Sequence, residues 1–233
     1  MTVYSDRTFL QRFDRDSGAV LEGMQFTNCT FDNCALSLTK SPNLRSTVRN
    51  VQVVNCVTVN CGVGPAVFED VVVDGLDTND LLILWSPLFK HVTLRGKIGK
   101  IKINTAAHFV DRSLEVQRPF DQARVRFYKS VDWALDISEA EFGEFDMHGV
   151  PSRLVRRDPA TQVVVTRERA LQSGWRDRLS AANTHWPFVI DLFLEDGEPD
   201  IVLVAPKRKR KRDFTRLLDG LIELRQVGVA EPD

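Results

Sequence analysis

The chain has 233 residues, of which 43% are hydrophobic and 27% are charged, and its formal net charge is −1. This composition is typical of a folded protein with one or two cores, and the net charge gives no indication of a partner. No apolar run reaches the roughly 20 residues needed to span a bilayer, and the first residues lack the apolar centre of a secretory signal. We therefore expect a cytoplasmic protein without membrane contact.

A spaced apolar triplet recurs through the first 150 residues. Its members are Phe26, Cys29 and Phe31; Val48, Val51 and Val53; Phe68, Val71 and Val73; and Phe89, Val92 and Leu94. Successive triplets begin 22, 20 and 21 residues apart. A spacing of three and then two does not keep all three residues on one helix face, but its last pair alternates as in a strand. The fixed period predicts a solenoid whose units pack against their neighbours.

A second series of triplets is offset from the first by nine residues. It consists of Ile98, Ile101 and Ile103; Phe120, Ala123 and Val125; and Phe142, Phe145 and Met147. These triplets lie on another face of the coil, or an irregular coil intervenes. Residues that accept left-handed backbone stand seven positions into most units and predict repeated corners: Asn33, Asn55, Gly75, Gly96 and Gly149. Phe127 holds that position in the Phe120 unit, which we therefore expect to be distorted.

The four cysteines occur as two pairs, Cys29 with Cys34 and Cys56 with Cys61. Such pairs could bind zinc. However, Cys34 and Cys56 are 22 residues apart, and Cys29 aligns with Val51 in the next unit. We therefore expect stacked, buried thiols without a metal, which suits a reducing compartment.

Residues 24–37 (MQFTNCTFDNCALS) resemble the pentapeptide-repeat proteins, and residues 51–61 do so to a lesser degree. This resemblance implies a right-handed quadrilateral β-helix. Beyond Cys61 only the coil length persists, so we predict a mainly β chain in which residues 1–150 form an irregular right-handed parallel β-helix, a solenoid of coils of about 21 residues. A leucine-rich repeat is the alternative, but Leu76 and Lys97 hold positions where that repeat has Asn or Cys.

Residues 151–233 follow a change in composition and are predicted to form a smaller α/β extension or cap made of helix, hairpin and helix. Val163–Val165 suggests a strand, and Thr166 could cap a helix with Ala170, Trp175 and Ala182 on one face. Phe188–Leu194 and Ile201–Ala205 suggest a hairpin that turns at Asp196 and Gly197. An amphipathic helix is predicted after Asp213.

Six consecutive cations form the most conspicuous local feature: Lys207, Arg208, Lys209, Arg210, Lys211 and Arg212. This cationic run could contact phosphates or an acidic protein surface, or it could be a solvated connection. Residues 151–233 contain 15 basic and 13 acidic side chains, so nucleic acid is an unlikely partner. Trp85, Trp133 and Trp186 are further candidate anchors for a protein partner.

Catalytic patterns are scarce. The four histidines, His91, His108, His148 and His185, lack metal-binding spacing, and we predict no catalytic, cofactor or metal residues. Asp70, Asp74, Asp77 and Asp80 could serve a β-helix enzyme acting on polysaccharide, although a solvent-facing edge explains their alternation better.

The function expected from the sequence is binding of another protein without catalysis, in the form of a bacterial immunity protein or inhibitor that neutralises a toxin or enzyme. The polysaccharide enzyme is one alternative. Pentapeptide-repeat proteins also include protectors of topoisomerases that imitate DNA. That role needs a strongly acidic surface, which this nearly neutral chain lacks.

Overall fold

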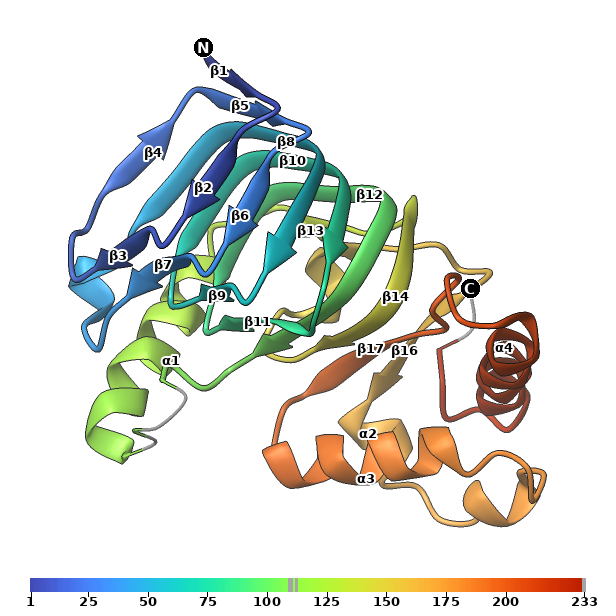
Figure 1. Ribbon diagram of the computed structural model, residues 1–233. Coiled ribbons are helices and arrows are strands. Elements are labelled where there is room, and N and C mark those ends of the chain that lie inside the picture. The colour runs from blue at the N-terminus through green and yellow to red at the C-terminus, as the bar shows by residue number, and fades with distance from the viewer. Residues whose placement is uncertain (109–110, 112, 232–233) are drawn as a thin grey trace.

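A curled sheet of parallel strands takes up most of the computed structural model, and a smaller layer of helices and two strands packs beside it (Figure 1). The structure describes residues 1–108, 111 and 113–231. Within these described residues, fifteen strands build the curled sheet. They are β1 (Thr2–Ser5), β2 (Thr8–Leu10), β3 (Phe13–Arg15), β4 (Val20–Glu22), β5 (Met24–Thr27), β6 (Thr30–Asp32), β7 (Ala35–Leu38), β8 (Thr47–Val59), β9 (Gly62–Val63), β10 (Val67–Thr78), β11 (Leu82–Trp85), β12 (Leu88–Asn104), β13 (Leu135–Asp136), β14 (Ala140–Met147) and β15 (Val155–Arg156).

The chain is mainly β, but the predicted right-handed β-helix of 21-residue coils is wrong. The central strands β8, β10 and β12 are 13, 12 and 17 residues long, and they lie side by side in one sheet that curls into a half-barrel. The main path of the sheet runs β1-β5-β8-β10-β12-β11-β9-β7-β3. The interval of about 21 residues is therefore the separation in sequence between residues that pair in neighbouring parallel strands. Periodicity alone does not distinguish short strands joined by corners from long strands that bend.

The parallel register explains both series of triplets. Phe68 pairs with Val48 on one side and with Phe89 on the other. Ile98 pairs with Phe142. Because Phe89 and Ile98 both belong to β12, the nine-residue offset between the two series arises within one long strand.

The first triplet pairs differently, which corrects the expected stacking of the cysteines. Phe26 pairs with Val53 rather than Val48, because a 3₁₀ turn at Pro42–Leu44 lengthens this connection. As a result, the Cys29 N–H donates to Cys56 Sγ at 3.4 Å, and the Cys34 N–H donates to Cys61 Sγ at 3.4 Å. Cys34 thus neighbours Cys61 instead of Cys56.

The predicted corners are confirmed. Asn33, Asn55, Gly75, Gly96 and Gly149 all have positive φ, between 50° and 80°. Asn55, Gly75 and Gly96 lie within β8, β10 and β12 and let these long strands bend without losing their parallel partners, because Asn and Gly tolerate left-handed backbone.

The Phe120 unit is a helix and not a distorted strand. Helix α1 (Leu114–Tyr128) begins after Ser113 and inserts between β12 and β13. Phe120 and Tyr128 are buried, and the Arg45 guanidinium lies 4.8 Å from the centre of the Phe120 ring. Ala123 and Val125 therefore lie on a helix that covers part of the sheet.

The C-terminal layer consists of an antiparallel pair, β16 (Gln162–Thr166) and β17 (Asp200–Val204), with helices α2 (Arg167–Ala170), α3 (His185–Asp196) and α4 (Lys211–Gln226). The predicted strand at Val163–Val165 and the last helix are confirmed. The long helix predicted after Thr166 is wrong: α2 has four residues, although Thr166 does accept the expected cap bond from the Arg169 N–H.

The predicted hairpin is also wrong. Phe188–Leu194 belongs to α3, whose buried residues Trp186, Ile190 and Phe193 follow helical spacing. Gly197, with φ of 75°, ends the helix, and the strand after it pairs with β16 instead.

Side chains of β16 and β17 alternate between two cores. Val164, Val202 and Val204 pack into the core of the curled sheet. Val163, Val165, Ile201 and Leu203 pack against the helices. The pair β16–β17 thus joins the two layers.

Candidate functional site

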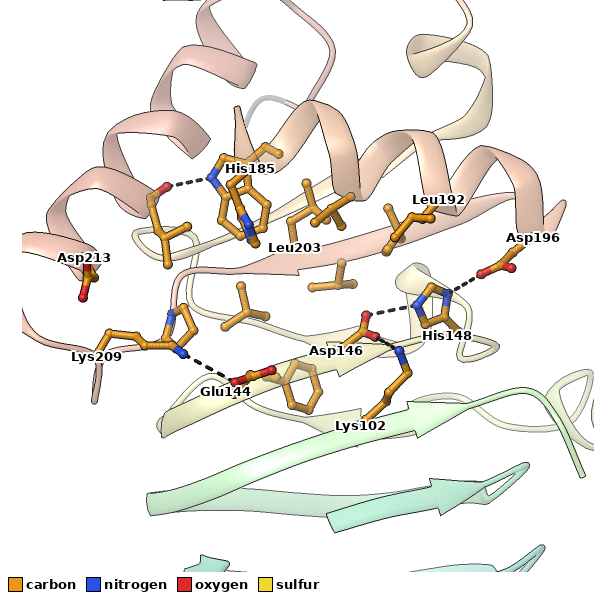
Figure 2. Close-up of a pocket in the computed structure, with 18 of the residues that line it drawn as sticks. Lys102, Glu144, Asp146, His148, His185, Leu192, Asp196, Leu203, Lys209 and Asp213 are labelled. Atoms are coloured by element: carbon orange, nitrogen blue, oxygen red, sulfur yellow. Dashed lines mark hydrogen bonds and ion pairs between the residues drawn. The ribbon is translucent and has the colours of Figure 1, made fainter. Parts of the chain in front are cut away.

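A cavity of about 660 Å³ lies between the ends of β12 and β14 and the C-terminal layer (Figure 2). Its apolar lining includes Phe145, Val189 and Leu192, and charged side chains stand on both rims. The cavity lining in the described structure contains no serine, threonine or cysteine, so it offers no hydroxyl or thiol nucleophile.

One rim of the cavity carries a chain of ion pairs. Asp146 accepts from Lys102 Nζ at 2.7 Å and lies 3.0 Å from His148 Nε2. His148 Nδ1 lies 3.3 Å from Asp196 Oδ2 without hydrogen-bond alignment, and this nitrogen is buried. Figure 2 shows His148 between Asp196, at the end of α3, and Asp146, which in turn faces Lys102.

The charges of this cluster stabilise one another. Burial alone would raise the pKa of Asp146, but His148 and Lys102 lower it to about 2. Burial alone would lower the pKa of His148, but Asp146 and Asp196 raise it above its ordinary value. An imidazolium held between two carboxylates is a poor general base, so this cluster fits a structural role better than a catalytic one.

Sequence reasoning missed this cluster. Asp146 and His148 are two positions apart at the end of β14. In an extended chain this spacing places both side chains on the same face, and this was the available sequence signal. Their partners Lys102 and Asp196 come from β12 and α3, and only the fold brings these together.

The cationic run lies at the opposite end of the cavity, and its first half is neutralised by carboxylates of β10, of β14 and of the loop before β16. Lys207 pairs with Asp158 at 2.9 Å, Arg208 lies 3.9 Å from Asp77, and Lys209 lies 3.4 Å from Glu144. These pairs fix the start of α4 to the curled sheet.

The second half of the run is exposed. Arg210 caps α4 without a side-chain bond, and Lys211 and Arg212 begin the helix. Arg210, Arg212, Asp213 and Arg216 line a second hollow of about 460 Å³ that adjoins the first.

The three candidate tryptophans belong to separate parts of the fold: β11, the connection before β13, and α3. Trp186 is only 4% exposed, and its indole N–H donates to the Leu217 carbonyl at 2.8 Å, so it serves the core. Trp85 is half-buried on β11. Trp133 is half-buried beneath the Arg156 guanidinium, 4.1 Å from its ring centre. The structure does not gather them into one surface.

The candidate carboxylates of β10 face cations. Asp70 lies 3.1 Å from His91 Nδ1, Asp74 pairs with Arg95 at 2.9 Å, and Asp77 faces Arg208. Asp80 is exposed. The described residues contain no group of three or more metal-ligand side chains arranged to hold an ion.

The thiols are occupied by hydrogen bonds. Burial raises the pKa of Cys56 and that of Cys61. Cys61 Sγ also donates to the Phe31 carbonyl at 3.2 Å. This is the environment of packed, unreactive thiols.

A further candidate site is the open edge of the sheet, formed by β1, β2, β3 and β4. Each of these strands pairs on one side only, with β5, β6, β7 and β8 in turn. Val3, Leu10 and Phe13 are 54%, 55% and 58% exposed along this edge. Behind them, Tyr4 and Phe26 stack with ring centres 5.2 Å apart.

Comparison with known proteins gives no match among family models, curated proteins or solved structures. The resemblance to pentapeptide-repeat proteins therefore stays a prediction from residues 24–61. In the part of the chain that the structure describes, no helix has both the length and the apolar character needed to cross a bilayer.

Proposed function

We propose that this chain is a protein-binding module that receives an extended segment of another protein along the open edge β1–β4. The observation that carries this proposal is that four successive strands pair on one side only while exposing apolar side chains. An unpaired strand edge is a template for a further strand, and strand addition is a recurring way to bind peptides.

The backbone of this edge has groups that point outward. The N–H groups of Thr2 and Asp6 donate inward to carbonyls of the β5 region. Because successive residues of a strand alternate in direction, the N–H of Val3 faces away from the sheet. The inward bond of Gln11 to the Asp32 carbonyl places the Leu10 N–H outward in the same way.

The side chains of the edge indicate the character of the partner. Val3, Leu10 and Phe13 offer separate apolar contacts, whereas the corners between them carry charges of both signs, such as Asp6 and Arg7. Residues 2–22 have a net charge of only −1, with four acidic and three basic side chains, which favours an extended partner segment that is apolar and carries little charge.

The cavity supports binding better than polysaccharide chemistry. Its half-buried carboxylate, Asp146, is held in ion pairs, and the acidic residues of β10 face His91, Arg95 and Arg208. Paired carboxylates free to act as acid and base are the requirement of glycoside hydrolysis.

A synthetic peptide with the sequence of residues 22–38 tests this proposal. These residues include β5, β6 and β7, the parallel partners of β1, β2 and β3, so the peptide carries the apolar spacing that the sheet already accepts. We expect fluorescence anisotropy to show that it binds the intact chain. A scrambled peptide of the same composition should not bind.

Two leucine-to-proline variants locate the binding. Leu10→Pro removes an outward N–H from the edge and should abolish peptide binding. Leu114→Pro is the matched control, because Leu114 is 65% exposed at the first position of α1, where proline is tolerated. Equal binding by both variants, or no binding by the unaltered chain, contradicts the proposal. Concentration-dependent self-association that Leu10→Pro abolishes would also contradict it, by assigning the edge to a second copy.

The same pair of variants applies to a toxin or enzyme partner, which the sequence alone favours. If this chain inhibits such a partner through the edge, Leu10→Pro should lose inhibition in an assay of that partner, and Leu114→Pro should retain it.

A further inference from the structure

The start of α4 concentrates positive charge that the fold does not neutralise. Three arginines and one aspartate line the hollow of about 460 Å³, which gives it a net charge of +2. No carboxylate of the described residues lies within 4.0 Å of the guanidinium nitrogens of Arg210, Arg212 or Arg216. By contrast, Lys207 and Lys209 have carboxylate partners.

The helix itself adds to this positive field. The first N–H groups of a helix lack partners within it, and the helix dipole is positive at this end. Arg210, at the cap, supplies no side-chain acceptor. Cations at a helix N-terminus are unfavourable, so Arg210, Lys211 and Arg212 lower stability unless an anion joins them.

A neighbouring histidine reports the same field. His185 lines the adjoining cavity at the start of α3. Burial lowers its pKa, the charges of Arg216 and Lys209 lower it further, and Glu144 acts in the opposite direction. The cavity shares Asp213 and Arg216 with the hollow, but its own lining holds five carboxylates and three Lys or Arg side chains, so the positive charge is concentrated at the hollow.

We propose that the hollow formed by Arg210, Arg212 and Arg216 at the start of α4 binds the terminal phosphates of a soluble oligophosphate. Guanidinium groups bind phosphate oxygens in pairs, and the free N–H groups of the first helical turn suit the same anion. The organic part of such a ligand would extend into the adjoining cavity, whose wall there includes Val189. This proposal does not depend on the open edge.

Inorganic triphosphate is the probe, and isothermal titration calorimetry on the intact chain is the measurement. We expect binding that weakens as salt rises, because the contacts are charged. The double variant Arg212→Gln/Arg216→Gln should weaken binding by at least about tenfold. Its matched control is Arg118→Gln/Arg126→Gln, which removes two exposed charges from α1. The control should bind within about twofold of the unaltered chain.

Further arms identify the source of the phosphate. ATP should bind at least as tightly as triphosphate if the adjoining cavity receives an organic body. Vesicles of phosphatidylcholine with phosphatidic acid, and a short DNA duplex, test a lipid headgroup and nucleic acid. Absence of triphosphate binding, an equal loss in the α1 control, or tighter binding of vesicles or duplex than of triphosphate would overturn the proposal. Circular dichroism and thermal unfolding of each variant exclude loss of fold as the cause.

Discussion

At the scale of single residues, a cluster of partly buried charges holds the two layers together. Lys102 and Asp146 belong to the curled sheet, while Asp196 ends α3, and His148 lies between the two carboxylates. Such a cluster is stable only while every member keeps its charge, because an unpaired buried charge is costly. The titration of His148 and Asp146 therefore governs how firmly the layers join.

The sign of the pH dependence follows from the two pKa shifts. The pKa of His148 is raised in the folded state, so its contribution is complete below about pH 6.5 and is lost as pH rises through the folded value. The pKa of Asp146 is lowered to about 2, so its contribution is lost as pH falls from about 4 towards that value. Stability due to this cluster should therefore peak between about pH 4 and 6.

Urea unfolding across this range checks the prediction. Raising the pH from about 6 to 9 should lower the free energy of unfolding of the unaltered chain by about 1 kcal/mol more than that of His148→Gln. His185→Gln is the control and should retain the loss, because the pKa of His185 is shifted downward. Parallel curves for the unaltered chain and His148→Gln would show that the cluster does not titrate in this way.

At the scale of elements, the sequence predicted strands and corners better than helices. The left-handed positions of Asn55 and Gly75 follow from residue chemistry alone, and both are confirmed. Phe188–Leu194 looks like a strand because it is a short apolar run, and such runs are ambiguous between a buried helix and a strand. The α1 insertion was hidden because Phe120 happens to fall on the triplet spacing.

Close approach of neighbouring strands gives a prediction at this scale. A Cβ at Gly99 in β12 would lie 2.5 Å from the backbone nitrogen of Thr78 in β10. Gly99→Ala should therefore force the two strands apart and lower the free energy of unfolding by about 1–3 kcal/mol. Gly62→Ala in β9 is the control, because its added Cβ meets nothing within 4 Å. Chemical denaturation measures both, and equal stabilities would contradict the tight register of β10 and β12.

At the scale of the whole molecule, the sequence could predict a repeated β architecture but not its shape. The interval between Phe68 and Phe89 records which residues become neighbours, and the register confirms that pairing. Whether strands close into coils or continue as a curled sheet depends on their length and bending, which arise from contacts between distant segments. The cavity could not be predicted from the sequence either, because its walls come from β14 and α3, which lie in different layers and are far apart in the chain.

The pair β16–β17 determines whether the layers unfold together. Val202 is 4% exposed and packs into the core of the curled sheet, while its neighbour Leu203 packs against the helices. Val202→Asp buries an unpaired carboxylate at this junction and should lower the free energy of unfolding by about 3–5 kcal/mol. Because the damage lies between the cores, the single thermal transition expected of the unaltered chain should split into two.

Differential scanning calorimetry of the intact chain distinguishes the outcomes. Ile222→Asp adds the same charge on α4, where Ile222 is 41% exposed, and it should leave one transition near the original temperature. Two transitions in the unaltered chain would mean that the β16–β17 pair does not couple the layers. One transition in Val202→Asp, shifted but not divided, would mean that the curled sheet cannot persist without the C-terminal layer, and the cavity between them would then belong to a single cooperative unit.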